Sequence, residues 1–313
     1  MPYNILVTGG AGYIGSILTP DLLAKGHKVT IVDNFMYQQN SLAHVCSDQK
    51  FSVARGDVRD EIFMKPLLAQ ADVIIPLAAL VGAPICAADP VGAATINKDA
   101  VLMIFKALSP KQVILMPTTN SAYGTGDENN FCTEESPLHP VSRYAIDKVM
   151  VEKALMEHPG AISFRLATVF GMSPRMRVDL LVNDFTYRAV NDRFVVLFES
   201  HFKRNYIHVR DVSRAFSHAL ENYDSMKGQI YNVGLSDANL SKWELCERIQ
   251  KQLPNFTFIE AKVGKDPDQR NYIVSNEKIE KTGFKPRVSL DQGIAELIKG
   301  YTMIRNARYG NIV

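Results

Sequence analysis

Tyr144 and Lys148 lie four residues apart in the stretch YAIDK, a spacing that points two side chains to the same face of a helix. A tyrosine acts as a base near neutral pH only when positive charge lowers its pKa, which is about 10 without neighbours. Lys148 would supply one such charge. Because similar pairs also occur on exposed helices without chemistry, the two residues need support from the rest of the chain.

A glycine-rich turn near the N-terminus, TGGAGYIG, has the form of a dinucleotide-binding turn. It places Gly9, Gly10, Gly12 and Gly15 between a strand-like run, YNILVT, and a helix expected at about 13–25. Glycines let the backbone turn sharply and approach a pyrophosphate, whose charge is stabilised by the helix N-terminus. A sharp turn without a ligand is the alternative. A nucleoside-triphosphate loop is excluded, because no Gly-Lys-Ser/Thr ends the turn.

Asp33 ends the next strand-like run, KVTIVD. A carboxylate there accepts hydrogen bonds from the adenosine ribose and repels a 2′-phosphate. No arginine or lysine occurs at 34–39, so the sequence favours NAD over NADP. We predict a dinucleotide site formed by Gly9, Gly12, Tyr13, Ile14, Gly15, Asp33, Asn34, Asp57 and Val58.

The elements that must position these residues alternate over the first half of the chain. Strand-like runs occur at KVTIVD, FSVARGD, DVIIPLAA, QVILMP and AISFRLA, with helices expected at about 91–108 and 142–158. Continuously apolar strands separated by helices are typical of a parallel sheet covered on both faces. We therefore predict an α/β fold, a doubly wound parallel sheet of the Rossmann type, with a smaller C-terminal substrate lobe. Residues 1–170 would form the dinucleotide-binding domain, with 206–233 returning to it, and residues 171–313 the lobe.

Composition limits the partners. The chain has 35 basic and 33 acidic residues and no basic block, so we expect no binding to nucleic acid. The four cysteines and seven histidines show no metal spacing, so we expect no metal site, a structural His208, and the reduced thiols of a cytoplasmic protein. The most apolar stretch, 71–95, contains aspartates and prolines, so we expect no membrane association.

In their order along the chain, these motifs resemble the extended short-chain dehydrogenases/reductases, in the branch of nucleotide-sugar epimerases and dehydratases. The resemblance covers nearly the whole length: TGGAGYIG, LAA at 77–79, Asn97, AYG at 122–124, YAIDK, RNYIHVRDV at 204–212 and YNVG at 231–234. It implies an enzyme that uses NAD and acts on a nucleotide sugar. A non-catalytic NAD sensor on the same fold is the alternative of another class, against which the retained Thr119, Tyr144 and Lys148 argue.

The resemblance also implies residue roles. Tyr144 would remove a proton from a sugar hydroxyl while hydride leaves the same carbon for NAD. Lys148 would bind the nicotinamide ribose, and Thr119 would hydrogen-bond the reacting oxygen. Leu77, Ala78 and Ala79 would join the cofactor site. The substrate site would comprise Thr119, Asn120, Ser121, Thr168, Arg204 and Arg270, with the arginines on phosphate.

Asn120 and Ser121 narrow the reaction. The 4,6-dehydratases of this branch carry proton-moving acids at these two positions, and the decarboxylating relatives carry a glutamate where this chain has Ser121. Neither residue is a general acid or base near neutral pH. We expect NAD-dependent oxidation at sugar carbon 4, by a 4-dehydrogenase or, if the hydride returns to the opposite face, by a 4-epimerase. The stretches TTNSAYG and DQRNYIVS look closest to GDP-manno-heptose carbon-4 oxidoreductases of bacterial capsule synthesis, which favours a GDP-linked heptose or hexose.

The helices expected at 91–108 and 142–158 carry more apolar residues than one sheet face needs, namely Met103, Phe105, Met150 and Leu155. The matching helices of the family pair across a two-fold axis. We therefore expect a homodimer or a dimer of dimers.

Overall fold

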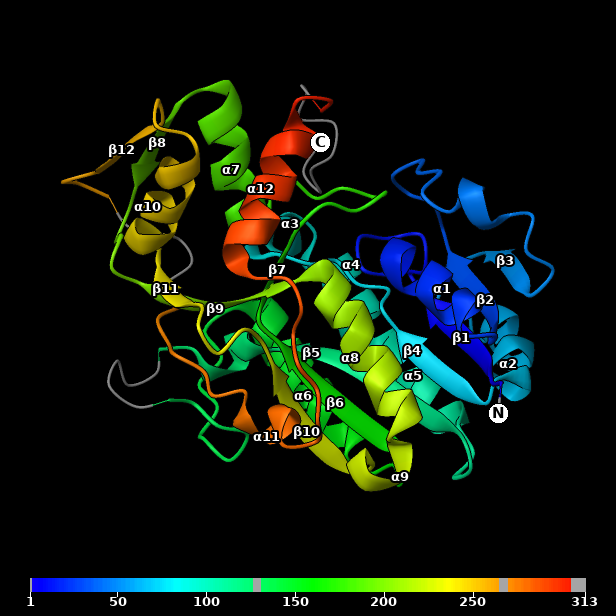
Figure 1. Ribbon diagram of the computed structural model, residues 1–313. Coiled ribbons are helices and arrows are strands. Elements are labelled where there is room, and N and C mark those ends of the chain that lie inside the picture. The colour runs from blue at the N-terminus through cyan, green and yellow to red at the C-terminus, as the bar shows by residue number, and fades with distance from the viewer. Residues whose placement is uncertain (1, 126–130, 265–269, 305–313) are drawn as a thin grey trace.

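Seven parallel strands form the central sheet, in the order β3-β2-β1-β4-β5-β6-β10 (Figure 1). The structure is a computed structural model that describes residues 2–125, 131–264 and 270–304. The strands are β1 (Asn4–Thr8), β2 (Lys28–Asp33), β3 (Phe51–Arg55), β4 (Val73–Pro76), β5 (Val113–Thr119), β6 (Ala161–Leu166) and β10 (Gln229–Val233). Every residue of β4, β5 and β6 is buried, as is typical of parallel strands covered on both faces. The predicted doubly wound sheet is confirmed.

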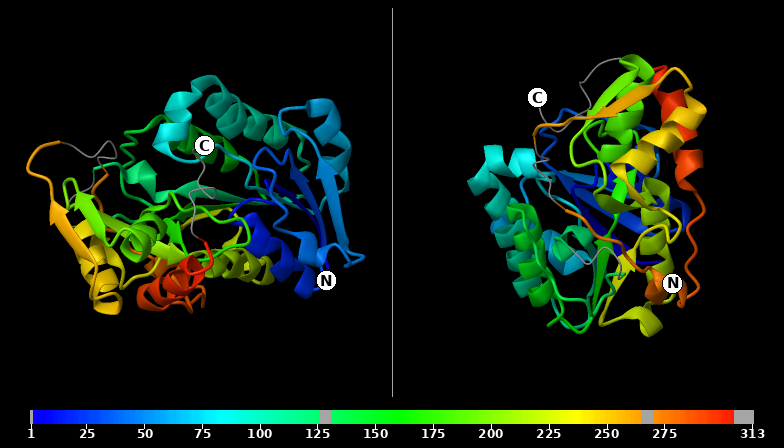
Figure 2. Two further views of the ribbon diagram at one scale, coloured as in Figure 1. Left: turned by 90° about the horizontal axis from the view of Figure 1, so that it is seen from above. Right: turned by 90° about the vertical axis from the view of Figure 1, so that its left-hand side faces the viewer.

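Helices cover both faces of this sheet (Figure 2). On one face α1 packs against α8, and on the other α5 packs against α2 and α6. The helices of this lobe are α1 (Gly15–Ala24), α2 (Glu61–Gln70), α3 (Ala83–Ala88), α4 (Pro90–Ala94), α5 (Ala100–Ala107), α6 (Arg143–Leu155), α8 (Val209–Glu221) and α9 (Tyr223–Met226). The helix expected at 91–108 is interrupted by a π-helical turn at Thr95–Asp99, where the amide of Asn97 bonds both backbone groups of Leu80 at 2.8 Å.

The second lobe is built mainly from residues beyond 167. It contains a three-stranded sheet of β7 (Thr168–Phe170), β9 (Lys203–His208) and β11 (Asn239–Ser241), and a parallel pair, β8 (Phe194–Leu197) and β12 (Thr257–Glu260). The helices α7 (Leu181–Asn191), α10 (Lys242–Gln252) and α12 (Leu290–Tyr301) pack against one another. A short helix, α11 (Glu277–Glu280), packs on β10. Within 206–233, α8 and β10 lie with the first sheet, whereas the end of β9 belongs to the second lobe.

Among the residues that the structure describes, no helix is long and apolar enough to cross a membrane. On α6, Met150 is half exposed and Ile146 is 40% exposed, but Leu155 is completely buried beneath the helix. Leu155 therefore cannot contribute to an intersubunit surface, because its side chain already fills the core beside Ile114 and Val151.

Candidate active site

One large cavity, of about 1020 Å³, lies at the carboxyl ends of the central strands and extends to the second lobe. Ligands of open α/β sheets bind at this edge. All the predicted cofactor residues line it, and so do Thr119, Ser121, Tyr144, Lys148, Thr168, Arg204 and Arg270. Residues from opposite ends of the chain therefore meet around a single space.

The glycine turn forms the first end of this cavity. Gly9 has a positive φ of +66°, and a Cβ atom there would lie 2.7 Å from the Ala78 backbone, so the turn requires glycine at this position. A Cβ on Gly15 would lie 2.4 Å from the carbonyl oxygen of Gly10. The first turn of α1 has no side-chain cap. The arrangement is a cradle that fits a pyrophosphate at a helix N-terminus.

Asp33 is held in place at the end of β2. Its Oδ2 accepts a hydrogen bond from the Ala11 amide at 3.1 Å, and its Oδ1 accepts one from the Phe35 amide at 2.8 Å. Burial raises the pKa of Asp33, although these hydrogen bonds oppose the shift. The carboxylate is thus fixed beside the glycine turn, where it can bind ribose hydroxyls.

Tyr144 and Lys148 lie on the first turns of α6, which begins at the N-cap Ser142. The Lys148 Nζ donates to the Pro117 carbonyl oxygen at 3.3 Å and lies 6.0 Å from the centre of the Tyr144 ring. Burial lowers the pKa of Lys148 to about 8. Burial also raises the pKa of Tyr144 to about 12, against the influence of Arg177 and Arg270. The protein without cofactor therefore does not by itself produce a tyrosine base near neutral pH.

A chain of polar contacts joins Thr119, Ser121 and Arg270. The Thr119 hydroxyl donates to the Ser121 Oγ at 2.9 Å, and the Ser121 amide donates back to the Thr119 Oγ1 at 3.1 Å. Arg270, from the segment before α11, donates a hydrogen bond to the same Ser121 Oγ. The part of the cavity lined by Thr119, Ser121 and Arg270, here called the reacting end, thus contains two hydroxyl groups and a guanidinium.

The end of β5 is supported from behind by a buried ion pair. Arg165 lies 2.7 Å from Glu152, and Glu152 also accepts a hydrogen bond from Thr118 at 2.8 Å. Arg165 bonds the Tyr123 hydroxyl at 3.0 Å, and that hydroxyl donates to Asn232 at 2.7 Å. Because these contacts come from β6, α6 and β10, they fix Thr119 relative to the rest of the sheet.

Asn120 was expected in the substrate site, but in this structure its side chain is completely buried and does not line the cavity. It lies in a single 3₁₀ turn, Asn120–Tyr123, which directs Ser121 to the cavity and Asn120 away from it. The structure therefore gives no support to a substrate contact by Asn120.

Three further cations line the cavity, and sequence reasoning missed them. Arg175 and Arg177 follow β7, and Lys242 begins α10. The Arg177 guanidinium pairs with Asp179 at 2.5 Å, and the Lys242 Nζ donates to the Phe198 carbonyl oxygen at 2.7 Å. The stretch SPRMR offered a signal, since two arginines so close to the expected end of the first domain could have been weighed as ligands. Lys242 offered none, because a lysine at a helix start is ordinary.

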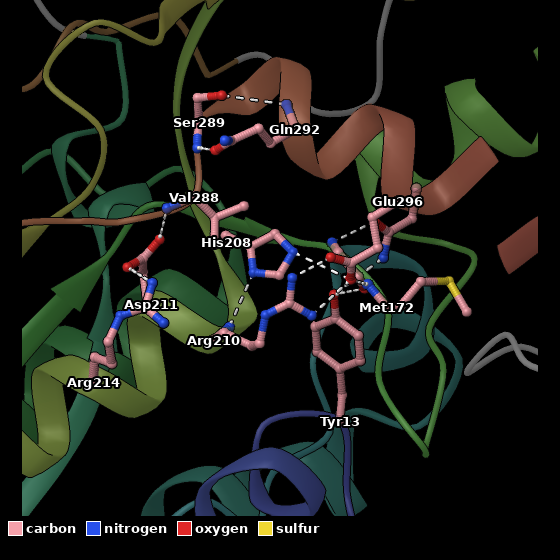
Figure 3. Close-up of polar contacts among 12 residues, drawn as sticks. Tyr13, Met172, His208, Arg210, Asp211, Arg214, Val288, Ser289, Gln292 and Glu296 are labelled. Atoms are coloured by element: carbon pink, nitrogen blue, oxygen red, sulfur yellow. Dashed lines mark hydrogen bonds and ion pairs between the residues drawn. The ribbon is translucent and has the colours of Figure 1, made fainter. Parts of the chain in front are cut away.

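Residues that follow β7 are tied to the glycine turn. The Tyr13 hydroxyl donates to the Gly171 carbonyl oxygen at 2.6 Å and accepts from Asn183 at 3.2 Å. Glu296 of α12 accepts a hydrogen bond from the Met172 amide at 3.0 Å and lies 3.4 Å from the His208 Nε2 (Figure 3). His208 is completely buried, and its Nδ1 caps α8. The two lobes are thus joined directly beside the cofactor end of the cavity.

Comparisons with known proteins show the family and the fold of this chain. A family model described as the NAD dependent epimerase/dehydratase family matches residues 5–234. The chain is 29% identical to a dTDP-glucose 4,6-dehydratase of Actinoplanes over 97% of its length and 99% of that protein. It is 27% identical to a UDP-N-acetyl-alpha-D-glucosaminuronate decarboxylase of Bacillus cytotoxicus, over 98% of this chain and all of that one. Its fold matches UDP-glucuronic acid 4-epimerase from Bacillus cereus with a TM-score of 0.86, 21% identity and coverage of 96% and 100%.

Proposed function

Because this chain belongs to the NAD dependent epimerase/dehydratase family and is an NAD-dependent enzyme of nucleotide sugars, we propose that it oxidises the carbon-4 hydroxyl of its sugar. The product would be a 4-keto sugar. The fate of the reduced cofactor separates two forms of this activity, net dehydrogenation and 4-epimerisation, and we favour dehydrogenation.

In this proposal the chain's residues have distinct tasks. NAD, when bound, supplies the hydride acceptor. Tyr144 takes the proton of the carbon-4 hydroxyl, and the Thr119 hydroxyl holds the same oxygen by a hydrogen bond. Lys148, which Pro117 orients, binds the nicotinamide ribose and adds positive charge beside Tyr144. Because burial raises the pKa of Tyr144 to about 12, Tyr144 becomes a base only through the combined charge of Lys148 and the oxidised cofactor.

One observation carries the choice of reaction: the side chain that faces the reacting end at position 121 is a hydroxyl held by Thr119 and Arg270. Dehydration needs an acid and a base beside Thr119, and neither Ser121 nor the buried Asn120 can fill these roles. Asp179 also lines the cavity, but it is engaged by Arg177. The arrangement supports redox at carbon 4 without elimination or loss of carboxylate.

The far end of the cavity supports a substrate that carries phosphates. Arg204 lies over the Tyr272 ring at 5.8 Å from its centre, and Lys242 and Arg270 line the same cavity. Three cations in one cavity suit a nucleoside diphosphate. Together with the resemblance of TTNSAYG and DQRNYIVS to the GDP-manno-heptose oxidoreductases, this favours a GDP-linked heptose or hexose and a role in capsule synthesis.

Incubation of the purified protein with excess NAD and a panel of GDP-, UDP- and dTDP-linked sugars tests the proposal. NADH absorbance and NMR of the sugar would be followed together. We expect one NADH for each 4-keto sugar formed from a GDP-linked substrate. An inverted sugar without net NADH would establish the epimerase instead. Loss of water or carbon dioxide would overturn the role given to position 121, and no reaction with any sugar would favour an NAD-binding sensor.

A further inference from the structure

We propose that Arg175 binds the phosphate groups of NAD and, with Tyr37, closes the cofactor end of the cavity so that NAD dissociates slowly. The segment that carries it, residues 171–177, is called the strap here. The inference depends on the family's use of NAD and is independent of the reaction proposed above.

The strap lies on the first turn of α1, where a dinucleotide pyrophosphate is stabilised in this fold. Ser173 contacts Ser16 hydroxyl to hydroxyl at 2.8 Å and donates to the Tyr13 carbonyl oxygen at 2.7 Å. The Arg175 amide lies 3.4 Å from the Ser16 hydroxyl oxygen. Arg175 therefore begins within contact of the glycine turn.

From this point the Arg175 side chain reaches across to the residues that follow β2. Its guanidinium carbon lies 4.2 Å from the centre of the Tyr37 ring, which is stacking distance. Arg175 is only 6% exposed and lines the cavity together with Tyr37 and Asp33. The contact joins two segments that are more than a hundred residues apart, on either side of the cofactor end.

The chemistry of this site fits a phosphate ligand. The Arg175 guanidinium donates a hydrogen bond to the Met176 carbonyl oxygen, and the planar donors of a guanidinium match phosphate oxygens. Burial lowers the pKa of Arg175, while the charges of Asp33 and Asp179 oppose that shift. The Tyr37 hydroxyl oxygen is also buried, without a hydrogen-bond partner among the described residues. Asp33 lines the cavity beside Arg175 and Tyr37, and its carboxylate would repel a 2′-phosphate. The pyrophosphate is therefore the phosphate group of the cofactor that suits Arg175.

The strap is also anchored on its outer side. Glu296 accepts the hydrogen bond of the Met172 amide and pairs with Arg210 and His208, which fixes the strap to α12 and α8 (Figure 3). The Tyr13 hydroxyl bonds Gly171 from the side of the glycine turn. Arg175 is thus presented by a segment attached on both sides, so its guanidinium is pre-positioned for a ligand.

Variants of the full-length protein test the proposal by binding rather than by turnover. Arg175→Met keeps the buried apolar volume but removes the charge, Arg175→Lys keeps a charge without the planar group, and Arg248→Ala removes an exposed arginine that pairs with Asp291 on the surface. Calorimetry would give the affinities for NAD, ADP-ribose and NADP, and competition experiments the NAD dissociation rate. Circular dichroism and thermal melting would confirm that each variant folds.

We expect Arg175→Met to weaken the binding of NAD and of ADP-ribose by the same factor, about 10- to 100-fold. Most of this loss of affinity should come from faster dissociation. The affinity of Arg175→Lys for both ligands should lie between those of Arg175→Met and the wild type. Arg248→Ala should bind both ligands as tightly as the wild type does. Unchanged affinity for both ligands in folded Arg175→Met and Arg175→Lys would overturn the proposal. A larger loss for NADP than for NAD would also overturn it, because the guanidinium would then act on the 2′-phosphate.

Discussion

The guanidinium of Arg270 donates a hydrogen bond to the hydroxyl of Ser121, a residue 149 positions earlier in the chain. The contact joins the segment before α11 to the end of β5, so it brings a positive charge to the hydroxyl groups of the reacting end. Ser121 accepts from Thr119 at the same oxygen, and the three side chains therefore act as one unit.

A double-mutant cycle on this pair should show coupling. We expect Arg270→Ala to raise KM about 10-fold or more, because a charge-assisted contact in a partly buried site is lost. Ser121→Ala should raise KM by a smaller factor. The double variant should have a KM no higher than that of Arg270→Ala alone. Steady-state kinetics on the best substrate of the panel would measure this. Fully additive losses would show that the two residues act separately.

Tyr144→Phe should retain NAD but lose at least about 100-fold in kcat, because the base is removed while the cavity shape is kept. Tyr3→Phe, which removes a phenol hydroxyl on another part of the fold, is the matched control and should leave kcat unchanged. Bound NAD can be quantified by its absorbance after denaturation. Substantial turnover by Tyr144→Phe would transfer the role of base to another group.

Burial of Lys148 should make the cofactor-free protein less stable below about pH 8 than a variant without this charge. The folded pKa, about 8, is lower than the unfolded value of about 10.4, so the folded state binds fewer protons between the two values. The penalty is fully present below pH 8 and is relieved as pH rises toward 10.4. Its upper limit is about 3 kcal/mol.

Cofactor-free Lys148→Met should therefore unfold at a higher urea concentration than the wild type near pH 7, with the difference shrinking toward pH 10. The control is Lys153→Met, on an exposed position of the same helix. It should show no pH-dependent difference from the wild type. An advantage of Lys148→Met that stays constant with pH would mean that packing, not charge burial, is responsible.

Glu296 should stabilise the junction of the lobes in a pH-dependent way. Burial alone would raise its pKa, but contacts with His208 and Arg210 outweigh this effect and lower the pKa of Glu296 to about 2. A depressed carboxyl pKa contributes stability above the unfolded value of about 4.3, and the contribution is lost as pH falls toward 2. Glu296→Gln should cost about 1–3 kcal/mol in the free energy of unfolding near pH 7.

Denaturant titrations of Glu296→Gln near pH 7 and near pH 3 would measure this difference, which should decrease at the lower pH. Glu277→Gln, in an exposed pair with Lys281, should leave the free energy of unfolding almost unchanged at both pH values. The same loss for Glu296→Gln at both pH values would show that the carboxylate charge is not the cause.

The exposed face of α6 should form a subunit interface. Met150 is 51% exposed and Ile146, one turn earlier, is 40% exposed, so two apolar side chains lie together on the surface. We predict that the wild type elutes as a dimer or larger in gel filtration and that Met150→Glu elutes as a monomer. Met303→Glu, on an exposed methionine after α12, should elute as the wild type does. A monomeric wild type would refute the prediction.

Much of the fold followed from the sequence because it depends on short-range patterns. Buried parallel strands contain short runs rich in apolar residues, so β1, β2, β4, β5 and β6 could be recognised one at a time. The stretch VRDVSRAFSHALE has an amphipathic pattern that could also have predicted α8. The π-helical turn that divides the helix at 91–108 could not be predicted, because the buried Asn97 amide becomes apparent only when Leu80 lies beside it.

The sequence alone determined the glycine turn, the position of Asp33 at a strand end and the one-turn spacing of Tyr144 and Lys148, since each depends on neighbours along the chain. Only the tertiary structure decided which distant side chains meet. It placed Arg175 on Tyr37 and Arg270 on Ser121, it brought Lys242 and Arg204 to the same cavity, and it turned Asn120 into the interior. The physical reason is that the packing of the second lobe against the carboxyl edge of the sheet fixes these contacts, and no local pattern records that packing.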